Sequence, residues 1–255
     1  MKQGICHICG QYTDLTFEHL PPNKAYNDKR VKVFNGEDFL GRMKKPWDFE
    51  GIKYQYNQKG SGVYSLCESC NNNTGTWYGN DYVNISNAIL AFILNNDLDK
   101  AQAYEFKFKD FYPLRFLKQV ISMFASTFEE HTIPNDIELK KFLLDKNYNV
   151  LNANKYRVSM YILRTPKNAW TGLNALGNFK FNTVKLVANL DVFPLGFEFE
   201  INPIEKNDNL DITQLANNYG YDYKVNAHMV IPVRERNSFF PCDYRTKEEM
   251  EKRIK

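Results

Sequence analysis

The feature that most constrains this chain is a set of four cysteines arranged as two C-x-x-C pairs. The pairs are Cys6 with Cys9 and Cys67 with Cys70, and a long segment separates them. Thiolates at this spacing supply two metal ligands from one tight turn, so two such pairs complete a tetrahedral zinc site. A redox dithiol is disfavoured because neither pair lies in a βαβ context. We therefore expect a fold that brings the two pairs together around one structural zinc ion.

The composition is typical of a globular protein. Of the 255 residues, 43% are hydrophobic, 25% are charged and 15% are aromatic, which favours packed cores over disorder. The sequence has no apolar run of about eighteen residues or more, and residues 1–4 lack the apolar segment of a secretory signal. We therefore expect a cytoplasmic protein with no membrane partner. In a reducing compartment the cysteine pairs favour metal over disulfides, and we expect the fifth cysteine, Cys242, to be a buried small hydrophobe.

Residues 23–60 combine basic and aromatic side chains. The net charge of +3 permits a polyanionic partner without requiring one, because phosphate binding depends on local clustering of Lys and Arg. This irregular segment could be a solvated loop anchored by a few aromatic residues, or a loop that contacts a nucleic-acid backbone. Its basic and aromatic residues include Lys24, Lys29, Arg30, Lys32, Arg42, Lys44, Lys45, Lys53, Lys59, Tyr26, Phe34, Phe39, Trp47, Tyr54 and Tyr56.

The hydrophobic pattern predicts an α+β fold in two domains. In the first domain, residues 1–82, short strands are expected over 15–20 and 61–66, and a short helix is expected from Asn71 onward. The first strand should stop at the two prolines that follow it, because proline cannot donate to a continuing ladder. The two strands and the helix would surround the cysteine pairs.

The second domain, residues 83–255, is predicted to mix helices with an antiparallel sheet. A helix over 113–126 carries one apolar face and one polar stripe, and we interpret the stripe as a solvated face. A strand over 195–201 alternates apolar residues with Gly196, Glu198 and Glu200, which predicts one buried face and one solvated face. The polar stripe of the helix consists of Arg115, Lys118, Gln119 and Ser122.

Residues with catalytic potential stand next to both cysteine pairs. Glu18 and His19 follow the first pair, and Asn71 directly follows the second. A neutral histidine accepts a proton near pH 7, as a general base must. Carboxylate and amide oxygens are the ligands that a hard divalent cation prefers, and such a cation offsets phosphate charge.

This arrangement resembles the HNH (ββα-metal) nucleases, in particular those of the endonuclease VII type that are built on a treble-clef zinc knuckle. The resemblance covers roughly residues 4–80. Glu18 stands where the family more often has Asp, and Ser61-Gly62 stands near the place of a middle Asn. The motif reads Cys6-x-x-Cys9, Glu18-His19-Leu20-Pro21 and Leu66-Cys67-x-x-Cys70-Asn71.

The resemblance implies a metal-dependent endonuclease that hydrolyses phosphodiester bonds in DNA. His19 would be the general base that activates water. Glu18 and Asn71 would hold a catalytic Mg²⁺ or Mn²⁺, with Asn73 as a second candidate to bind the metal or orient the histidine. The zinc ion would remain structural. Residues 83–255 would supply recognition, regulation, or assembly as a homo-oligomer or with a partner protein.

Two other functions stay open at this point. The N-terminal unit could be a zinc-stabilised module that binds nucleic acid or protein without catalysis. It could also be an RNA nuclease with the same chemistry. The feature that separates a nuclease from a binding module is whether Glu18, His19 and Asn71 converge on one open site.

Overall fold

The computed structural model describes residues 2–96, 98, 102–178, 182–238 and 240–252. None of the helices in these ranges has the length and hydrophobicity needed to cross a membrane. In chain order the elements are β1 (Lys2–Ile5), β2 (Tyr12–His19), β3 (Val31–Phe34), α1 (Gly36–Arg42), β4 (Tyr54–Asn57), β5 (Gly62–Cys67), α2 (Glu68–Trp77), α3 (Gly79–Asn95), β6 (Ala103–Phe111), α4 (Pro113–Thr127), α5 (Thr132–Asn135), α6 (Ile137–Leu144), β7 (Tyr156–Leu163), β8 (Asn168–Trp170), β9 (Asn174–Asn178), β10 (Thr183–Val192), β11 (Leu195–Ile201), β12 (Leu210–Asp211), a 3₁₀ turn η1 (Thr213–Leu215), β13 (Val225–Arg234) and α7 (Lys247–Glu251).

The described strands form three sheets. A small N-terminal sheet has the order β1-β2-β5, and β3 pairs with β4 in a ribbon of its own. The large sheet has the order β6-β13-β7-β11-β10-β8, with β12 beside β7 and β9 beside β10. Its strands pair antiparallel except that β13 runs parallel to β7. The predicted α+β class is therefore confirmed.

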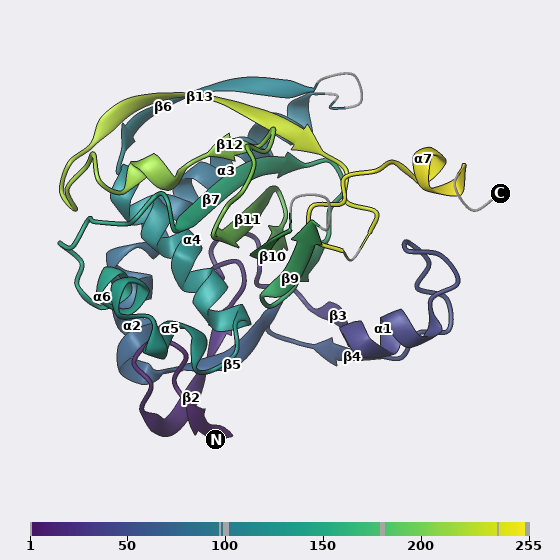
Figure 1. Cartoon of the computed structure of the whole chain (residues 1–255), viewed down its shortest axis with the longest axis horizontal. Helices are drawn as coiled ribbons and strands as arrows, with labels where there is room; N and C mark the ends of the chain where they lie inside the picture. The colour runs from purple at the N-terminus through teal and green to yellow at the C-terminus, as the bar shows by residue number, and fades with distance from the viewer. Residues whose placement is uncertain (1, 97, 99–101, 179–181, 239, 253–255) are drawn as a thin grey trace.

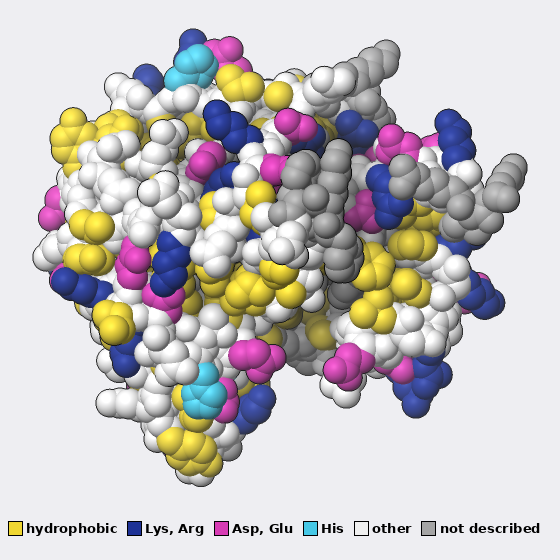
Figure 2. All heavy atoms as spheres, in the orientation of Figure 1, with side chains coloured by type: hydrophobic (Ala, Val, Ile, Leu, Met, Phe, Trp, Pro, Cys, Tyr) yellow, Lys and Arg dark blue, Asp and Glu magenta, His cyan; other side chains and the backbone are white. Residues whose placement is uncertain are grey.

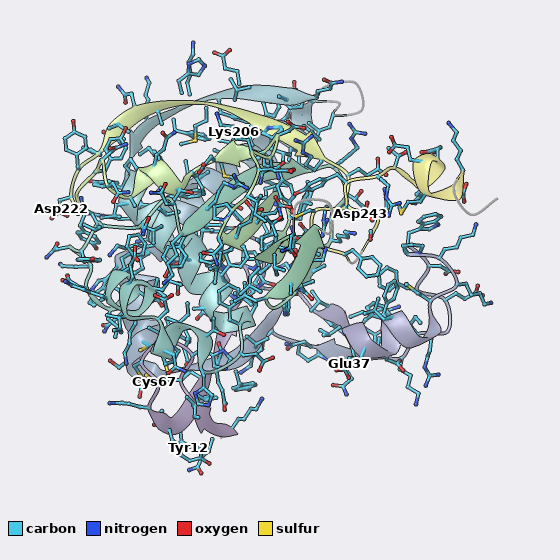
Figure 3. All side chains as sticks on the ribbon, in the orientation of Figure 1. Tyr12, Glu37, Cys67, Lys206, Asp222 and Asp243 are labelled. Atoms are coloured by element: carbon cyan, nitrogen blue, oxygen red, sulfur yellow. The ribbon has the colours of Figure 1, made fainter. Side chains whose placement is uncertain are left out.

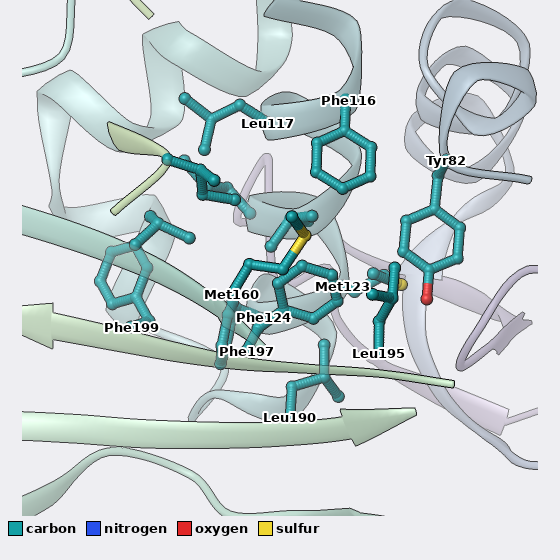
Figure 4. Close-up of a cluster of buried hydrophobic side chains, with 14 of the residues drawn as sticks. Tyr82, Phe116, Leu117, Met123, Phe124, Met160, Leu190, Leu195, Phe197 and Phe199 are labelled. Carbon is teal, nitrogen blue, oxygen red and sulfur yellow. The ribbon is translucent and has the colours of Figure 1, made fainter. Parts of the chain in front are cut away.

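Helix α4 forms the centre of the hydrophobic core. It lies against one face of the large sheet (Figure 1), and its aromatic side chains pack on those of β11 (Figure 4). The ring of Phe124 is 5.5 Å from that of Phe199, and the ring of Phe116 is 6.3 Å from that of Phe197. Tilted ring pairs of this kind stabilise a core beyond the area they bury.

The prediction that the polar stripe of this helix is solvated is wrong for Lys118, Gln119 and Ser122, all of which are buried. The reason is a second layer, formed by β5, α2, α3 and α6, that covers the side of α4 facing away from the sheet. A buried amino group needs hydrogen-bond acceptors. Lys118 Nζ donates to the carbonyl oxygens of Phe142 and Asp145, each at 2.6 Å.

The prediction of a solvated face on β11 is also wrong. Glu198 and Glu200 are 1% and 0% exposed, because the chain that follows β11 and the C-terminal segment fold back over this face. Glu200 forms salt bridges with Arg157 and Lys185, and Glu198 accepts a hydrogen bond from Asn209 at 3.0 Å. In β11 the alternation of apolar and polar residues therefore does not predict which side chains are exposed.

Residues 31–57, which we call the α1 lobe, were expected to be irregular and instead fold into β3, α1 and β4. The lobe projects from the rest of the molecule (Figure 1). Asn35 caps α1 by accepting from the first-turn amides, and this local signal is readable in the sequence. Inside the lobe the ring of Phe49 lies 4.9 Å from Phe34 and 4.6 Å from Phe39.

The predicted division at residue 82 falls inside α3, which runs from Gly79 to Asn95. One cluster of buried hydrophobic residues includes Cys6 and Ile8 from before this point together with Phe124 and Phe199 from after it. The two-domain organisation stays a prediction.

Burial of Lys118 should make the stability of the protein depend on pH. Burial lowers the pKa of this lysine from 10.5 to about 7. Between these values the unfolded chain binds more protons, so the free energy of unfolding rises as the pH increases through this window. Lys118→Met should abolish that contribution and, at alkaline pH, lower stability by about 1–3 kcal/mol, because the buried Phe142 carbonyl and the partly buried Asp145 carbonyl lose their donor.

Urea unfolding at several pH values measures both effects. Lys109→Met, at an exposed position on β6, is the matched control and should behave like wild type. A pH slope that is the same in wild type and Lys118→Met would contradict a lysine buried in its neutral form.

Candidate functional site

The four cysteines of the two pairs form one cluster. Their sulfur atoms all lie within 4.8 Å of one another, and Cys9 Sγ is 3.9 Å from Cys67 Sγ. Four sulfurs bound tetrahedrally to zinc at about 2.3 Å are about 3.8 Å apart. The cluster therefore has the donor set and the dimensions to hold a metal ion such as zinc.

Local structure explains how the cysteines meet. Cys6 and Cys9 lie in the turn between β1 and β2, and Cys67 ends β5, where it pairs with Leu15 of β2. Figure 3 shows Cys67 near the N-terminal strands. Helix α2 begins at Glu68, three positions before the predicted Asn71, because Cys67 Sγ caps it by accepting from the Cys70 amide at 3.4 Å.

The closeness of the four thiols to one another, together with their burial, shifts their pKa values. A hydrogen bond from Cys70 lowers the pKa of Cys6 to about 4, and the same bond raises the pKa of Cys70. Burial raises the pKa of Cys9. Without a cation, adjacent thiolates repel one another, whereas a coordinated zinc ion deprotonates its thiol ligands. The chemistry of this donor set fits a bound metal.

The turn that carries Cys6 and Cys9 also packs against the helices α4 and α5. His7 Nδ1 donates to the carbonyl oxygen of Ala125 in α4 at 3.2 Å. A Cβ added at Gly10, which has a φ of +81°, would lie 3.0 Å from Pro134 of α5. Because only glycine adopts this φ readily, the turn can press closely on the helical layer.

A pocket of about 210 Å³ lies beside the cysteine cluster, where the end of β2 faces α2, α3 and α4. Glu18, His19 and Asn71 all line it. Asn73 does not, because two positions along a helix turn a side chain to nearly the opposite face. Three of the four residues singled out from the sequence for catalysis are thus brought together.

Glu18 is a buried carboxyl group without a partner. It is only 7% exposed, and no described residue forms a hydrogen bond or salt bridge with its side chain. Burial raises its pKa to about 8, so the carboxyl group is mostly protonated at neutral pH unless a cation binds. A carboxylate in this situation is suited to hold a metal ion.

His19 ends β2 and is half-buried. Its ring packs edge-on against Phe17, with centroids 5.0 Å apart. Burial lowers the pKa of His19, which keeps the imidazole neutral at pH 7. A neutral, partly accessible imidazole is the form that accepts a proton.

Asn71 is oriented by β2. Its Nδ2 donates to Thr16 Oγ1 at 2.9 Å, and Thr16 donates in turn to the Leu66 carbonyl at 2.9 Å. These bonds occupy the side-chain nitrogen of Asn71 and leave its side-chain oxygen, Oδ1, without a described donor. The oxygen is therefore available as a ligand.

Gln119 is a residue of the pocket that the sequence pattern does not indicate. It is 1% exposed and lines the pocket from α4, and its Oε1 is buried without a hydrogen-bond partner. An unpaired buried amide costs about 1–3 kcal/mol, so a ligand at this place would satisfy it. No local signal identifies Gln119, because its pattern is that of a solvated helix face.

Asn27, a second residue that the sequence pattern does not indicate, holds the segment that follows His19. Asn27 Nδ2 donates to the carbonyl oxygens of Pro21 at 2.6 Å and Ser61 at 2.7 Å, and its Oδ1 accepts from the Ser61 amide. Beside it, Gly62 permits close contact of β5 with β2, since an added Cβ would lie 2.1 Å from the Glu18 carbonyl oxygen. These contacts make the end of β2 rigid.

Comparisons with protein-family models, with curated proteins and with solved structures found no match to this chain. Any functional conclusion therefore depends on the site itself: its residues, their burial and their geometry. The resemblance to HNH nucleases stays an inference from the motif.

Replacing Cys67 tests the metal cluster. Cys67→Ser removes one ligand and the sulfur cap of α2, so the variant should lose its bound metal and the unit of β1, β2, β5 and α2 should unfold. Metal analysis of the purified protein and circular dichroism measure the two effects. Cys242→Ser, outside the cluster, should retain the metal and the fold. A Cys67→Ser protein that folds normally without metal would refute the four-thiolate site.

Proposed function

We propose that this protein is a metal-dependent endonuclease of the HNH type that hydrolyses phosphodiester bonds in DNA. The observation that carries this proposal is that Glu18, His19 and Asn71, which come from two segments far apart in the sequence, line one open pocket beside the cysteine cluster. Convergence of these three residues is the feature that separates a nuclease from a purely structural zinc module.

The local architecture supports the same proposal. Strands β2 and β5 pair antiparallel and β5 leads directly into α2, while β3, α1 and β4 are inserted between the two strands. Two paired strands followed by a helix are the arrangement of a ββα-metal unit. In this interpretation the zinc ion is structural, and it clamps the end of β5 to the turn that precedes β2. The proposed catalytic residues Glu18, His19 and Asn71 then lie beside the cysteine cluster.

His19 is the proposed general base. Its imidazole is neutral because burial lowers its pKa, and it would take a proton from the attacking water. Glu18 and the free carbonyl oxygen of Asn71 would hold Mg²⁺ or Mn²⁺. Such an ion, when bound, offsets charge on the scissile phosphate and on the leaving oxygen. Burial of Glu18 strengthens its attraction for a cation, because few waters compete for the carboxylate.

Two further residues complete the proposed site. Gln119 Oε1 lies in the wall of the pocket without a described partner and would accept a hydrogen bond from the attacking water. Lys24 also lines the pocket and supplies a positive charge for the backbone phosphate. Asn73 lies outside the pocket, so in this proposal it makes no direct contact with substrate.

Removal of the proposed base should abolish catalysis. We expect His19→Ala to lower the cleavage rate by about 10²–10⁴-fold, the usual contribution of a general base. Plasmid DNA and single-stranded RNA are incubated with each protein in Mg²⁺, in Mn²⁺ or without added divalent cation. His228→Ala, on the exposed part of β13, is the matched control and should retain activity.

The same assay decides between the alternatives. If the protein cleaves RNA and not DNA, the substrate in this proposal is RNA. Equal behaviour of wild type and His19→Ala on every substrate would contradict the catalytic proposal and favour a zinc-stabilised binding module.

The proposed metal ligand Glu18 should make Mg²⁺ binding depend on pH. Since burial raises the pKa of Glu18 from 4.5 to about 8, the stability it contributes without metal is present below pH 4.5 and is lost as the pH rises through 8. Deprotonation near pH 8 creates the ligand, so Mg²⁺ should raise the melting temperature by about 3 °C more above this pH than below it.

Thermal denaturation with and without Mg²⁺ measures this difference. Glu18→Gln should remove it, whereas Glu105→Gln, an exposed carboxylate on β6, should not. An identical Mg²⁺ effect in wild type and Glu18→Gln would exclude Glu18 as a ligand.

A further inference from the structure

A second and larger pocket, of about 500 Å³, lies between the α1 lobe and the edge of the large sheet that carries β8. Figure 2 shows the surface hollowed between the lobe and the rest of the molecule, with hydrophobic side chains gathered on the lobe beside the hollow. Its volume falls in the range of pockets that hold one small organic ligand. Neither the cysteine cluster nor His19 lines this pocket, so it is a separate site.

Flat aromatic side chains form two sides of this pocket. Trp47, Phe34 and Phe49 come from the α1 lobe, and Trp170 comes from β8 on the opposite side. Phe34 and Phe49 are fixed by their mutual contact, with ring centroids 4.9 Å apart. Aromatic faces held by a folded framework are the surfaces on which nucleobases stack.

The charge of the pocket is mainly positive. The described residues that line it include four cationic side chains and one carboxylate, that of Asp191. Lys32 and Lys247 are exposed at its rim, whereas Arg236 is buried and Lys167 half-buried in its floor. This balance favours an anionic ligand, and exposed lysines at a rim suit the phosphates of a strand.

The floor is a preformed polar network. Asp191 accepts from Tyr161 Oη at 2.6 Å and from Arg236 Nε at 3.2 Å. Arg236 Nη1 is held by the carbonyl oxygens of Phe240 and Asp243, and Lys167 donates to the Arg236 carbonyl. Polar groups fixed in this way need little reorganisation when a ligand binds.

The second pocket adjoins the strand that carries His19. Ser61 lines the pocket and precedes Gly62, which pairs with His19 in the N-terminal sheet. The Ser61 carbonyl oxygen also accepts from the Leu20 amide at 3.0 Å. A strand bound in this pocket would therefore leave it next to the end of β2.

We propose that this second pocket binds one unstacked nucleotide of a single-stranded nucleic acid, with its base against the aromatic side chains and its phosphates near the cationic rim. A nucleotide combines a flat ring with negative charge. The aromatic side chains of the pocket suit the base, and the cationic side chains suit the phosphates. Binding at this site is independent of cleavage at His19. It deepens the proposed function because it specifies an unpaired segment as the part of the substrate that the protein recognises.

The tryptophans allow a direct test. The chain has three, and Trp47 and Trp170 line the pocket while Trp77 lies in α2. In a protein that carries Trp77→Phe, tryptophan fluorescence, excited selectively at wavelengths that tyrosine does not absorb, reports on the pocket alone. The protein also carries His19→Ala, and no divalent cation is added, so that no strand is cut. Chelators are avoided because they would remove the metal of the cysteine cluster.

A short single-stranded DNA oligonucleotide should quench this fluorescence saturably. Trp47→Ala should weaken binding about fivefold or more, the loss expected when one base loses its stacking partner; in this variant, fluorescence anisotropy of a labelled oligonucleotide measures the affinity. Lys32→Glu with Lys247→Glu should weaken binding and reduce its salt dependence. The matched controls Tyr12→Ala and Lys53→Glu change exposed residues outside the pocket and should bind as the parent does.

Three results would overturn the proposal. They are the absence of quenching by any single strand, equal affinity of the parent and Trp47→Ala, and quenching by mononucleotides that an oligonucleotide does not displace. The last result would indicate a site for free nucleotides. None of these results bears on catalysis, which is measured separately by cleavage with the His19 variants.

Discussion

The structure depends first on the meeting of two cysteine pairs that are far apart in the sequence. Because Cys67 both ends β5 and caps α2, bringing it to the first knuckle fixes a strand and a helix at once. Asn71 directly follows Cys70 in α2 and donates a hydrogen bond to Thr16 of β2, the strand that ends at His19. The cysteine cluster thus brings two distant segments together, and the hydrogen bond from Asn71 to Thr16 joins them directly beside the pocket.

A second constraint is that α4 is buried on both sides. It lies between the large sheet and a layer of helices, so its polar residues must find partners inside the protein. Lys118 donates to two backbone carbonyl oxygens, so its role is to stabilise the fold. Glu18 and Gln119 have no described partner, and both line the pocket next to the cysteine cluster. Unpaired polar groups are costly in a core. Other buried atoms, such as Ser65 Oγ and Ser122 Oγ, also lack a described partner, but those two residues do not line this pocket.

Much of the site was predictable because its information is local. The spacing of the cysteines predicted their cluster, and the adjacency of Glu18 and His19 to one pair and of Asn71 to the other placed them near each other. Gln119 and Asn27 were not predictable. Gln119 comes from a helix whose pattern indicates a solvated face, and Asn27 acts through bonds to Pro21 and Ser61 that only the folded chain brings together.

By itself, the sequence determined the α+β class, the cysteine cluster and the residues beside it, since each follows from periodicity or from spacing along the chain. The tertiary structure decided which polar faces are solvated. Glu198 and Glu200 alternate as solvated residues would, yet later segments of the chain cover them. It also decided that the α1 lobe faces β8 across a pocket of aromatic and cationic residues. Burial is a property of layers formed by distant segments, so no pattern within one helix or strand can determine it.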